Sequence, residues 1–378
     1  MNWINKRFGD CAELIRSSVK PEEATGKSYI GLEHISQGQL SLIGFGKSDC
    51  VISQKFLFKK GDILFGKLRP YFRKVIIAPF DGVCSTDIWV VRAKQEIDQR
   101  FLFYWMASSD FVESASMASE GTKMPRAQWE FVSRLEKEIP GLSEQRAIAE
   151  VLSSLDDKIE LNRRMNVTIE ELAKTLFNHW FIKDGDHYDF EEKPLDEIAV
   201  FLNGLALQKF PPNGNEYLPV VKIAQLRKNN TSDADKASIQ LDPDYVVNDG
   251  DVLFSWSGSL EVVIWCGGKG ALNQHLFKVT SIEFPKWFYY FWIKHHLKNF
   301  QSIASGKATT MGHIQRHHLN EARVLIPEKT ELIKMNEIMD PLINKMIGNN
   351  IQSRTLAELR DMLLPKLMSG QVRVKGFA

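Results

Sequence analysis

The side chains best suited to chemistry lie in a cation-rich segment near position 70. Four basic residues and one aromatic residue occur there within eight positions: Lys67, Arg69, Tyr71, Arg73 and Lys74. Such cations can hold the phosphate backbone of a nucleic acid, and arginine can also form two hydrogen bonds with guanine. The same charges would protect an exposed strand edge from pairing with another chain. The segment therefore indicates either a nucleic-acid contact or a solvated strand edge.

The corresponding segment in the second half of the chain, 255–259, contains no cation. It offers the hydroxyl groups of Ser257 and Ser259 instead. Hydroxyl groups can form hydrogen bonds with phosphates or with bases. We expect such a difference if the two segments contact different base sequences, and relaxed drift would leave the same pattern.

Two further loops combine hydroxyl, amide and basic side chains immediately before a short predicted helix. They contain Thr122, Lys123 and Arg126 in the first half, and Lys307, Thr309, Thr310, Gln315 and Arg316 in the second. Exposed N–H groups at a helix N-terminus, together with such donors, suit phosphate contact. An ordinary capped and solvated loop has the same composition, so both interpretations stay open.

A short polar run precedes a predicted strand in each half. In the run 273–275, Asn273 and Gln274 carry amides that can pair with adenine. The matching run 85–87 ends in Asp87, which could accept a hydrogen bond from cytosine. Side chains of these types also cap strands and turns through bonds to the backbone. Base recognition and a structural role are both consistent with the sequence.

Several patterns resemble catalytic motifs but fail on spacing. Gly26-Lys27-Ser28 and Gly46-Lys47-Ser48 end like a phosphate-binding loop, yet the glycine required earlier in that motif is replaced by Pro21 and Ser41, respectively. The run 211–214 has letters of an adenine-methyltransferase tetrapeptide in the wrong order, and we interpret it as a turn. The sequence therefore favours a chain without a catalytic site.

Metal and nuclease sites are also disfavoured. His313, His317 and His318 have helical spacing, but no nearby cysteine completes a zinc-binding set. The acidic run 156–158 lies in a long predicted helix, where charged side chains normally solvate the exposed face. We therefore expect neither a metal ion nor a nuclease centre in this chain.

The composition is that of a globular protein with two or three domains. The chain has 378 residues, of which 44% are apolar, and 48 Lys and Arg against 47 Asp and Glu, so a polyanion must be bound by local patches. No signal-peptide pattern or apolar run of ~20 residues is present. We expect a cytoplasmic protein in which Cys11, Cys50, Cys84 and Cys266 are reduced core thiols.

A long helix over 142–182 is the strongest structural signal among the elements that must position these residues. At alternating spacings of four and three, it places mostly apolar residues on one face, which we name the helix-pair seam. The seam contains Ile148, Leu152, Leu155, Ile159, Asn162, Asn166, Ile169, Ala173, Leu176 and Trp180. Such a face is built to lie against another helix.

A matching seam occurs 187 positions further along the chain. It contains Met335, Met339, Leu342, Met346, Asn349, Ser353, Leu356, Arg360, Leu363 and Leu367. Asn162 and Asn349 occupy the same seam position. A polar residue in an apolar seam costs stability but penalises slipped registers. We interpret the two asparagines as a device that fixes the register of a helix pair.

The same offset relates much of the remaining chain, which indicates an internal repeat. Residues 61–65 match 250–254 with one β-branched exchange, and Tyr29-Ile30 matches Tyr217-Leu218 with one residue of slippage. Further matches join 101–105 to 288–292 and Ile139-Pro140 to Ile326-Pro327. Constant offsets in helices and small drifts in loops are expected of a duplicated domain.

Each repeat is predicted to contain about 140 residues of mixed α/β structure followed by a long helix. A Gly-Asp turn opens a buried strand, and a short helix and a last strand precede the long helix. Strands are expected at 62–65, 75–78 and 88–92 and again at 251–254, 262–266 and 276–280, with helices near 100–117 and 286–303. In those helices we expect Trp105, Tyr289, Phe291 and Trp292 in the core rather than in a base-stacking platform.

Antiparallel pairing of the two long helices would relate the repeats by a pseudo-twofold axis. The 142–182 helix would then form a rod of about 60 Å. Such a rod is longer than one turn of duplex DNA, which is about 34 Å. We therefore expect the pair to hold two modules apart in the manner of a calliper.

The segments around the long helices resemble the shared regions of type I restriction-modification specificity subunits. The central resemblance rests on Ile139-Pro140, Glu144-Gln145-Arg146, 155–159, Asn162-Arg163-Arg164 and 176–181. The C-terminal resemblance rests on Arg354-Thr355-Leu356, Leu359-Arg360-Asp361 and 363–370. Both regions occur in the expected order, each after a unit the size of a target-recognition domain, and the resemblance covers essentially the whole chain.

The resemblance implies a noncatalytic specificity subunit with an α/β fold. Two target-recognition domains would each recognise half of a split target in double-stranded DNA, and two antiparallel coiled-coil helices would fix the gap and dock two modification subunits. S-adenosylmethionine would be bound by the modification subunits, and ATP and Mg by a restriction subunit, so this chain would bind no cofactor. The implied segments are recognition domains at 1–141 and 194–328, long helices at 142–182 and 329–370, a linker at 183–193 and a tail at 371–378.

Two other functions are less well supported. A DNA adenine methyltransferase or nuclease would need catalytic motifs that fail on spacing here. A coiled-coil interaction scaffold would retain the helices without recognising DNA. The apolar end of the first long helix, formed by Leu176, Phe177, Trp180 and Phe181, could pack inside the helix pair or dock a partner.

Overall fold

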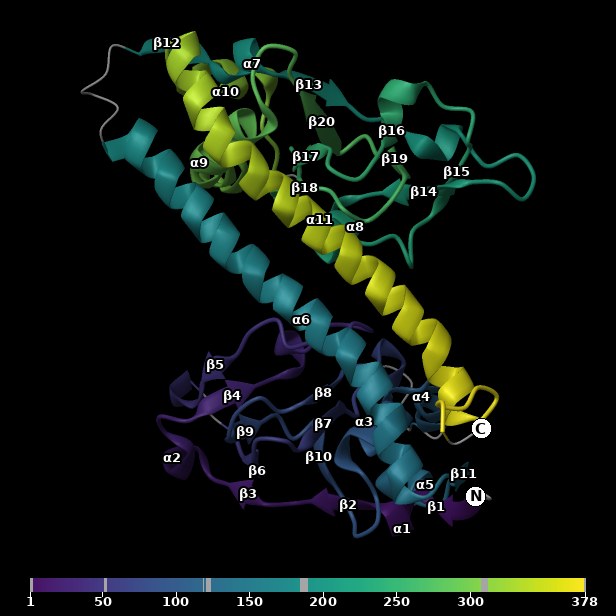
Figure 1. The fold of residues 1–378 in the computed structure, drawn as a ribbon. Coiled ribbons are helices and arrows are strands. Elements are labelled where there is room, and N and C mark those ends of the chain that lie inside the picture. Colours follow the sequence, from purple (N-terminus) through teal and green to yellow (C-terminus); the bar gives the residue numbers. More distant parts are fainter. Residues whose placement is uncertain are drawn as a thin grey trace. The chain divides into compact units, whose positions relative to one another are not determined.

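The computed structural model describes residues 3–50, 53–117, 119, 124–183, 190–306 and 312–376. The chain forms two compact units, Met1–Glu160 with Thr355–Ala378, and Leu161–Arg354. Each unit contains one α/β domain and parts of two long helices, α6 (Leu142–Asn178) and α11 (Lys329–Met368) (Figure 1). α6 continues into a π-helical turn at His179–Lys183. The two predicted long helices are confirmed.

The domain of the first unit contains two main sheets and a separate strand pair. One sheet is antiparallel with the order β2-β10-β7-β8, the other has the order β3-β6-β9-β4-β5, and β1 pairs with β11. The strands are β1 Ile4–Arg7, β2 Ala12–Ile15, β3 Ser18–Val19, β4 Ser28–Ile30, β5 Gly46–Lys47, β6 Lys55–Phe58, β7 Ile63–Gly66, β8 Val75–Ile77, β9 Gly82–Cys84, β10 Ile88–Ala93 and β11 Glu136–Ile139. The helices are α1 Phe8–Cys11, α2 Pro21–Ala24, α3 Gln99–Ala107, α4 Ser109–Met117 and α5 Trp129–Val132, with 3-10 turns at Leu32–His34, Ser48–Cys50 and Pro70–Phe72.

The domain of the second unit repeats this architecture. Its sheets have the orders β13-β20-β17-β18 and β15-β14-β19-β16, and β12 pairs with β21. The strands are β12 Glu191–Pro194, β13 Val200–Asn203, β14 Leu218–Val221, β15 Lys236–Ala237, β16 Val246–Val247, β17 Val252–Ser255, β18 Val262–Ile264, β19 Gly270–Leu272, β20 Leu276–Thr280 and β21 Arg323–Ile326. The helices are α7 Leu195–Ile198, α8 Ile223–Lys228, α9 Lys286–Ser305 and α10 Arg316–Glu321, with 3-10 turns at Leu207–Lys209 and Pro243–Tyr245.

The central strands begin where the Gly-Asp turns predicted them. Gly61 and Gly250 precede β7 and β17 with φ angles of 90° and 91°, a conformation that glycine adopts without a steric penalty. Every residue of β7 and β17 is buried. The aromatic residues Trp105, Tyr289, Phe291 and Trp292 are also buried, which confirms their prediction as core residues.

The amphipathic helix expected near 100–117 is interrupted in the first unit, whereas α9 is continuous in the second. The hydroxyl of Ser108 donates to the carbonyl of Trp105 at 2.7 Å and accepts from the amide of Phe111 at 3.4 Å. Ser108 thus terminates α3 and caps α4. The prediction of one continuous helix in the first unit was wrong.

The repeat also departs from the sequence alignment at two strands. β12 begins at Glu191, inside the expected linker. The sequence did not predict this strand, because its polar residues carry no hydrophobic alternation that would mark one. In the second sheets, Ile30 lies opposite Cys84, and Val221 lies opposite Leu272. Ile30 therefore corresponds to Val221 rather than to Leu218. Additional residues between β13 and β14 account for this shift.

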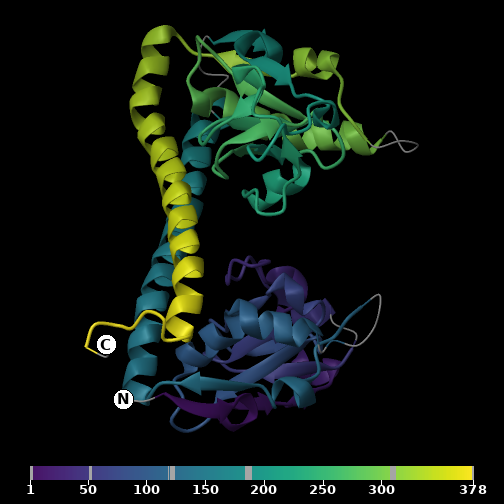
Figure 2. The ribbon, with the colours of Figure 1, turned by 90° about the vertical axis from the view of Figure 1, so that its right-hand side faces the viewer.

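α6 and α11 run antiparallel and lie side by side (Figure 1 and Figure 2). In the second unit, the Asn162 amide lies 3.3 Å from the Ser353 hydroxyl, and the Asn349 amide donates to the Asn166 side-chain oxygen at 2.8 Å. In the internal repeat, Asn162 corresponds to Asn349, and Asn166 corresponds to Ser353, 187 positions further along the chain. The contact between Asn162 and Ser353 is therefore the counterpart of the contact between Asn349 and Asn166. The polar layer therefore has a local twofold symmetry.

The helix-pair seam is fully buried only in parts. Ile148, Leu152, Asn162, Met346 and Asn349 are buried, whereas Leu155, Ile159, Ile169, Leu176, Leu342, Leu356 and Leu363 are half-buried. Residues beside the seam, such as Ala149, Ile343 and Leu364, are buried because each helix also packs on a domain. Phe177 and Phe181 belong to the core of the second unit, which places this end of α6 inside the protein.

Three cysteines are buried free thiols, namely Cys11, Cys84 and Cys266. Burial raises the pKa of Cys84 to about 12 and that of Cys266 to about 11. These two thiols therefore stay protonated near neutral pH, as expected of core cysteines. The side chain of Cys50 lies outside the described part of the chain.

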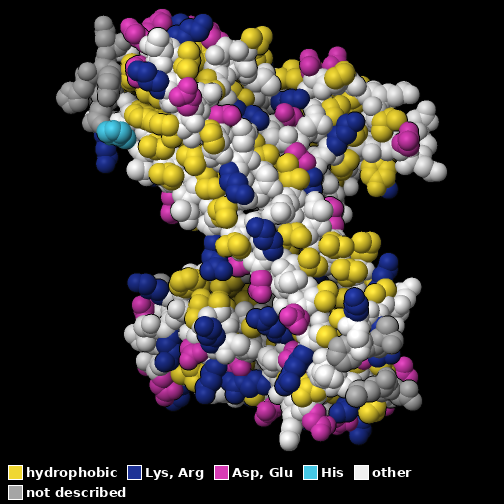
Figure 3. Space-filling model, viewed as in Figure 1, with side chains coloured by type: hydrophobic (Ala, Val, Ile, Leu, Met, Phe, Trp, Pro, Cys, Tyr) yellow, Lys and Arg dark blue, Asp and Glu magenta, His cyan; other side chains and the backbone are white. Residues whose placement is uncertain are grey.

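Basic and acidic side chains are interspersed over the face shown in Figure 3. This distribution agrees with the near balance of 48 basic and 47 acidic residues. Binding of a polyanion would therefore depend on local groups rather than on overall charge. Among the described helices, none is both long enough and apolar enough to cross a membrane.

Candidate nucleic-acid interface

The loop after β7 lies beside the segment that precedes α5 in the first unit. The amide of Arg69 donates to the carbonyl of Pro125 at 2.8 Å, and Leu68 forms a β-bridge with Arg126. The amide of Lys67 donates to the carbonyl of Asp87, just before β10, at 2.9 Å. The fold thus gathers Lys67, Arg69, Asp87 and Arg126, which we name the first strand-end cluster.

The second unit builds the same backbone framework with other side chains. The amide of Gly258 donates to the carbonyl of Gly312 at 2.8 Å, and Ser257 forms a β-bridge with His313. The amide of Trp256 donates to the carbonyl of His275 at 3.3 Å. We name Trp256, Ser257, His275 and His313 the second strand-end cluster.

The two frameworks require a left-handed backbone at the same position. Gly258 has a φ angle of 66°, and the corresponding Arg69 has a φ angle of 52°. Glycine takes this conformation freely, whereas a residue with a Cβ pays roughly 1–3 kcal/mol. The first unit therefore carries an arginine where the backbone favours glycine. A backbone outlier of this kind points to a function for the side chain.

The cation-rich segment separates into outward and inward side chains. Tyr71 is 52% exposed, whereas the ammonium group of Lys74 donates to the carbonyl of Leu32 at 2.5 Å. Burial lowers the pKa of Lys74. Arg73 donates through Nε to the carbonyl of Ala107 at 2.7 Å. These contacts favour structural roles for Arg73 and Lys74, while DNA contact by Lys67, Arg69 and Tyr71 stays a prediction.

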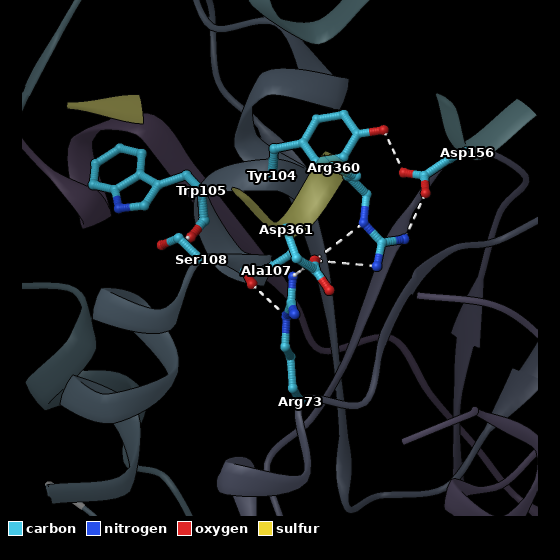
Figure 4. A network of polar contacts seen from close by, with 8 residues as sticks. All are labelled: Arg73, Tyr104, Trp105, Ala107, Ser108, Asp156, Arg360 and Asp361. Atoms are coloured by element: carbon cyan, nitrogen blue, oxygen red, sulfur yellow. Dashed lines mark hydrogen bonds and ion pairs between the residues drawn. The ribbon is translucent and has the colours of Figure 1, made fainter. Parts of the chain in front are cut away.

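Arg73 belongs to a polar network that joins the first domain to both long helices (Figure 4). Arg360 of α11 is 1% exposed and donates to Asp156 of α6 at 2.6 Å and to Asp361 at 3.1 Å. Asp156 accepts a hydrogen bond from Tyr104 at 2.6 Å, and Asp361 accepts one from Arg73 at 3.0 Å. Burial opposes the charge on Arg360, but the two carboxylates outweigh burial and raise its pKa.

The polar run before β20 also contains one side chain with a structural contact and one that lies at the candidate interface. Asn273 is 7% exposed, and its side-chain oxygen accepts the backbone amide of His275 at 3.3 Å, as a capping residue would. Gln274 contacts the His275 ring at 3.3 Å, and the Ser257 hydroxyl lies 2.9 Å from His275 Nδ1. Asn273 is therefore best explained as a structural residue, whereas Gln274 lies on the second strand-end cluster. Ser259 is exposed on the adjoining loop.

Several predicted phosphate contacts cannot be placed. Thr122, Lys123, Lys307, Thr309 and Thr310 lie outside the described residues. Gln315 and Arg316 are exposed at the start of α10, where a guanidinium nitrogen of Arg316 lies 3.4 Å from the carbonyl of Phe201. The DNA-binding roles of all these residues stay predictions.

His317, His318 and Glu321 of α10 bring three potential metal-ligating atoms within 4.8 Å of one another. His318 Nδ1 accepts the backbone amide of Gln315 at 2.9 Å, so only its Nε2 could bind an ion. His317 and Glu321 are exposed. Exposed groups of this kind commonly lie together without an ion, and the geometry assigns no metal to them.

The pairing of Asp87 with Arg126 is the main feature that the sequence did not predict. Arg126 donates to Asp87 through Nε at 2.8 Å and Nη2 at 3.4 Å. This hydrogen bond raises the pKa of Arg126. The alignment of the repeats matches the segment 85–87 with 273–275, and nothing in the local sequence connects Asp87 to Arg126. The two residues are 39 positions apart, and the repeat offsets relate them to His275 and His313 without indicating that they touch.

The comparison with known families agrees with this duplicated architecture. A family model described as the type I restriction modification DNA specificity domain matches the chain twice, at residues 2–171 and 188–358. The chain belongs to the type I DNA specificity family. Each match contains one of the two strand-end clusters, and the resemblance inferred from the residues is confirmed.

Individual type I specificity subunits are similar to this chain over part or most of their length. The MjaIX specificity subunit of Methanocaldococcus jannaschii is 26% identical over 390 residues, covering 94% of this chain and 87% of that protein. The EcoDI specificity subunit of Escherichia coli is 34% identical over 184 residues, covering 46% of this chain and 41% of that protein. The crystal structure of a type I S subunit from M. genitalium shares the fold, with a TM-score of 0.57 and 18% identity over 97% of this chain and 96% of that chain.

Proposed function

We propose that this chain is the sequence-specific DNA-binding subunit of a type I restriction-modification complex. Each α/β domain recognises one half of a bipartite target in double-stranded DNA, and α6 and α11 determine the spacing between the halves. The observation that carries this proposal is the pair of strand-end clusters. They share one backbone framework but present different side chains, as expected of two domains that recognise different half-sites.

The proposed partners follow from membership of the family. We infer that two modification subunits dock on the long helices and bind S-adenosylmethionine, and that a restriction subunit binds ATP and Mg. The chain itself acts without catalysis, because its phosphate-loop and methyltransferase-like patterns lack the required spacing. The named relatives come from an archaeon and a bacterium, which supports work on DNA in a prokaryotic cytoplasm.

Co-expression of the full chain with its cognate modification subunits tests this function. Single-molecule sequencing of methylated adenines in the host DNA should give one motif with two half-sites and a constant gap. A complex that forms but methylates no defined motif would support an interaction scaffold instead. Methyl transfer by the purified chain alone would support an enzyme with its own catalytic site.

A further inference from the structure

The neighbouring strands β7 and β10 of the first unit carry an aspartate–arginine pair at each end. At one end, Arg92 Nε donates to Asp62 at 2.6 Å, and Asp62 is only 3% exposed. The second unit keeps the aspartate as Asp251, which forms an ion pair at 3.3 Å with Lys278, two positions before the residue that matches Arg92. An aspartate paired with a basic residue thus recurs at this end in both units, which is expected of a structural contact.

The other end of the same strands differs between the units. The first unit has Asp87 and Arg126 there, and the second has His275 and His313 on a matching backbone. A purely structural ion pair would be expected to recur, as the pairing of an aspartate with a basic residue does at the opposite end. The divergence of side chains on a shared framework therefore marks this end as the one that determines specificity.

Asp87 holds the Arg126 guanidinium by one edge. The contacts to Nε and Nη2, at 2.8 and 3.4 Å, direct the edge formed by Nη1 and Nη2 away from the carboxylate. The Arg126 side chain is 43% exposed, and that of Asp87 is 25% exposed. An arginine presents two parallel N–H donors on such an edge, which match the O6 and N7 acceptors of guanine in the major groove.

The same contacts argue against the role first considered for Asp87. Each of its carboxylate oxygens already accepts a hydrogen bond from Arg126, which leaves less capacity to accept one from cytosine. An anion beside the guanidinium also restricts its rotation, which reduces the conformational entropy lost on binding. Asp87 thus acts as a positioning residue for Arg126.

We propose that Arg126, held in place by Asp87, recognises a guanine in the half-site of the first domain. This inference rests on the proposed DNA-specificity function and names the base that one of its domains selects. The second domain lacks an arginine at the corresponding position, His313, and therefore selects its bases by other contacts.

The full complex with its modification subunits tests the inference through the motif that it methylates. We compare wild type with Arg126→Gln and Asp87→Asn, and we use Arg92→Gln as a matched control on the structural pair. Both cluster variants should lose discrimination at one guanine of one half-site, by about tenfold or more for Arg126→Gln. The control should methylate the wild-type motif even if its melting temperature falls.

The inference is overturned if both cluster variants retain wild-type stringency at every position, or if neither wild-type half-site contains guanine. Loss of stability without a change in motif would likewise assign the pair a structural role only. If Arg126→Gln abolishes methylation altogether, Asp87→Asn decides, because it keeps the arginine and a side chain of the same shape. A wild-type complex without any defined motif would refute the proposed function itself.

Discussion

Substitution of Arg69 can test its predicted DNA contact separately from its effect on stability. Its left-handed backbone, with a φ angle of 52°, costs roughly 1–3 kcal/mol relative to glycine. Replacement by glycine relieves this strain, but it adds about 0.4–1 kcal/mol of unfolded-state entropy and removes an interaction that Arg69 makes in the folded state. The free energy of unfolding should therefore change little, although a positive charge is lost.

We predict that Arg69→Gly leaves the melting temperature near that of wild type while weakening binding to duplex carrying the target. If Arg69 contacts a phosphate, the plot of log affinity against log salt concentration should become less steep, by about one unit of slope. Arg73→Ala serves as the control, since Arg73 bonds to Ala107 and Asp361 and should affect stability rather than affinity. Wild-type affinity and salt dependence in Arg69→Gly would remove Arg69 from the interface.

The sequence predicted which kinds of residue gather at the candidate interface but not which way they point. The interleaved segment 67–74 was recognised as a whole, yet Arg73 and Lys74 turn inward because carbonyl and carboxylate acceptors from distant segments reach them. Asp361 and Arg73 are 288 positions apart, so no local pattern could join them. The Asp87–Arg126 pair depended on the same kind of long-range contact.

At the scale of elements, the long helices were the most predictable part of the fold. Their periodic seam gave α6 and α11 directly, because helix periodicity is a local property of the sequence. The short strand β12 and the break at Ser108 were missed, because a polar strand and a single capping hydroxyl leave weak signals. Arg360 was assigned to the seam, and the structure explains its presence by Asp156 and Asp361.

We predict that Arg360→Met destabilises the first unit by about 2–4 kcal/mol. The substitution removes a buried cation and leaves the carboxylates of Asp156 and Asp361 without their shared partner. Both carboxylates are partly exposed to solvent, which limits the loss of stability. Urea unfolding should show the loss, and Asp156→Asn should cost less in the Arg360→Met background than in wild type. Arg7→Ala, which removes an exposed ion pair, should change stability by under about 1 kcal/mol. An Arg360→Met midpoint no lower than that of Arg7→Ala would contradict this role.

At the scale of the whole molecule, the proposed function makes helix length a determinant of target spacing. The contacts between α6 and α11 are related by the internal repeat, so that each has a counterpart with the two helices interchanged. Insertions of equal length at facing positions of both helices can therefore preserve the seam. Seven residues keep the heptad pattern and lengthen each helix by about 10 Å.

We predict that heptads inserted after Lys158 and Ala357 increase the gap between half-sites by about three base pairs without changing either half-site. Sequencing of methylated adenines measures both quantities, and a heptad placed in the turn at Asn213 should leave the gap unchanged. A wild-type gap in the helix variant would show that the helices do not set the spacing.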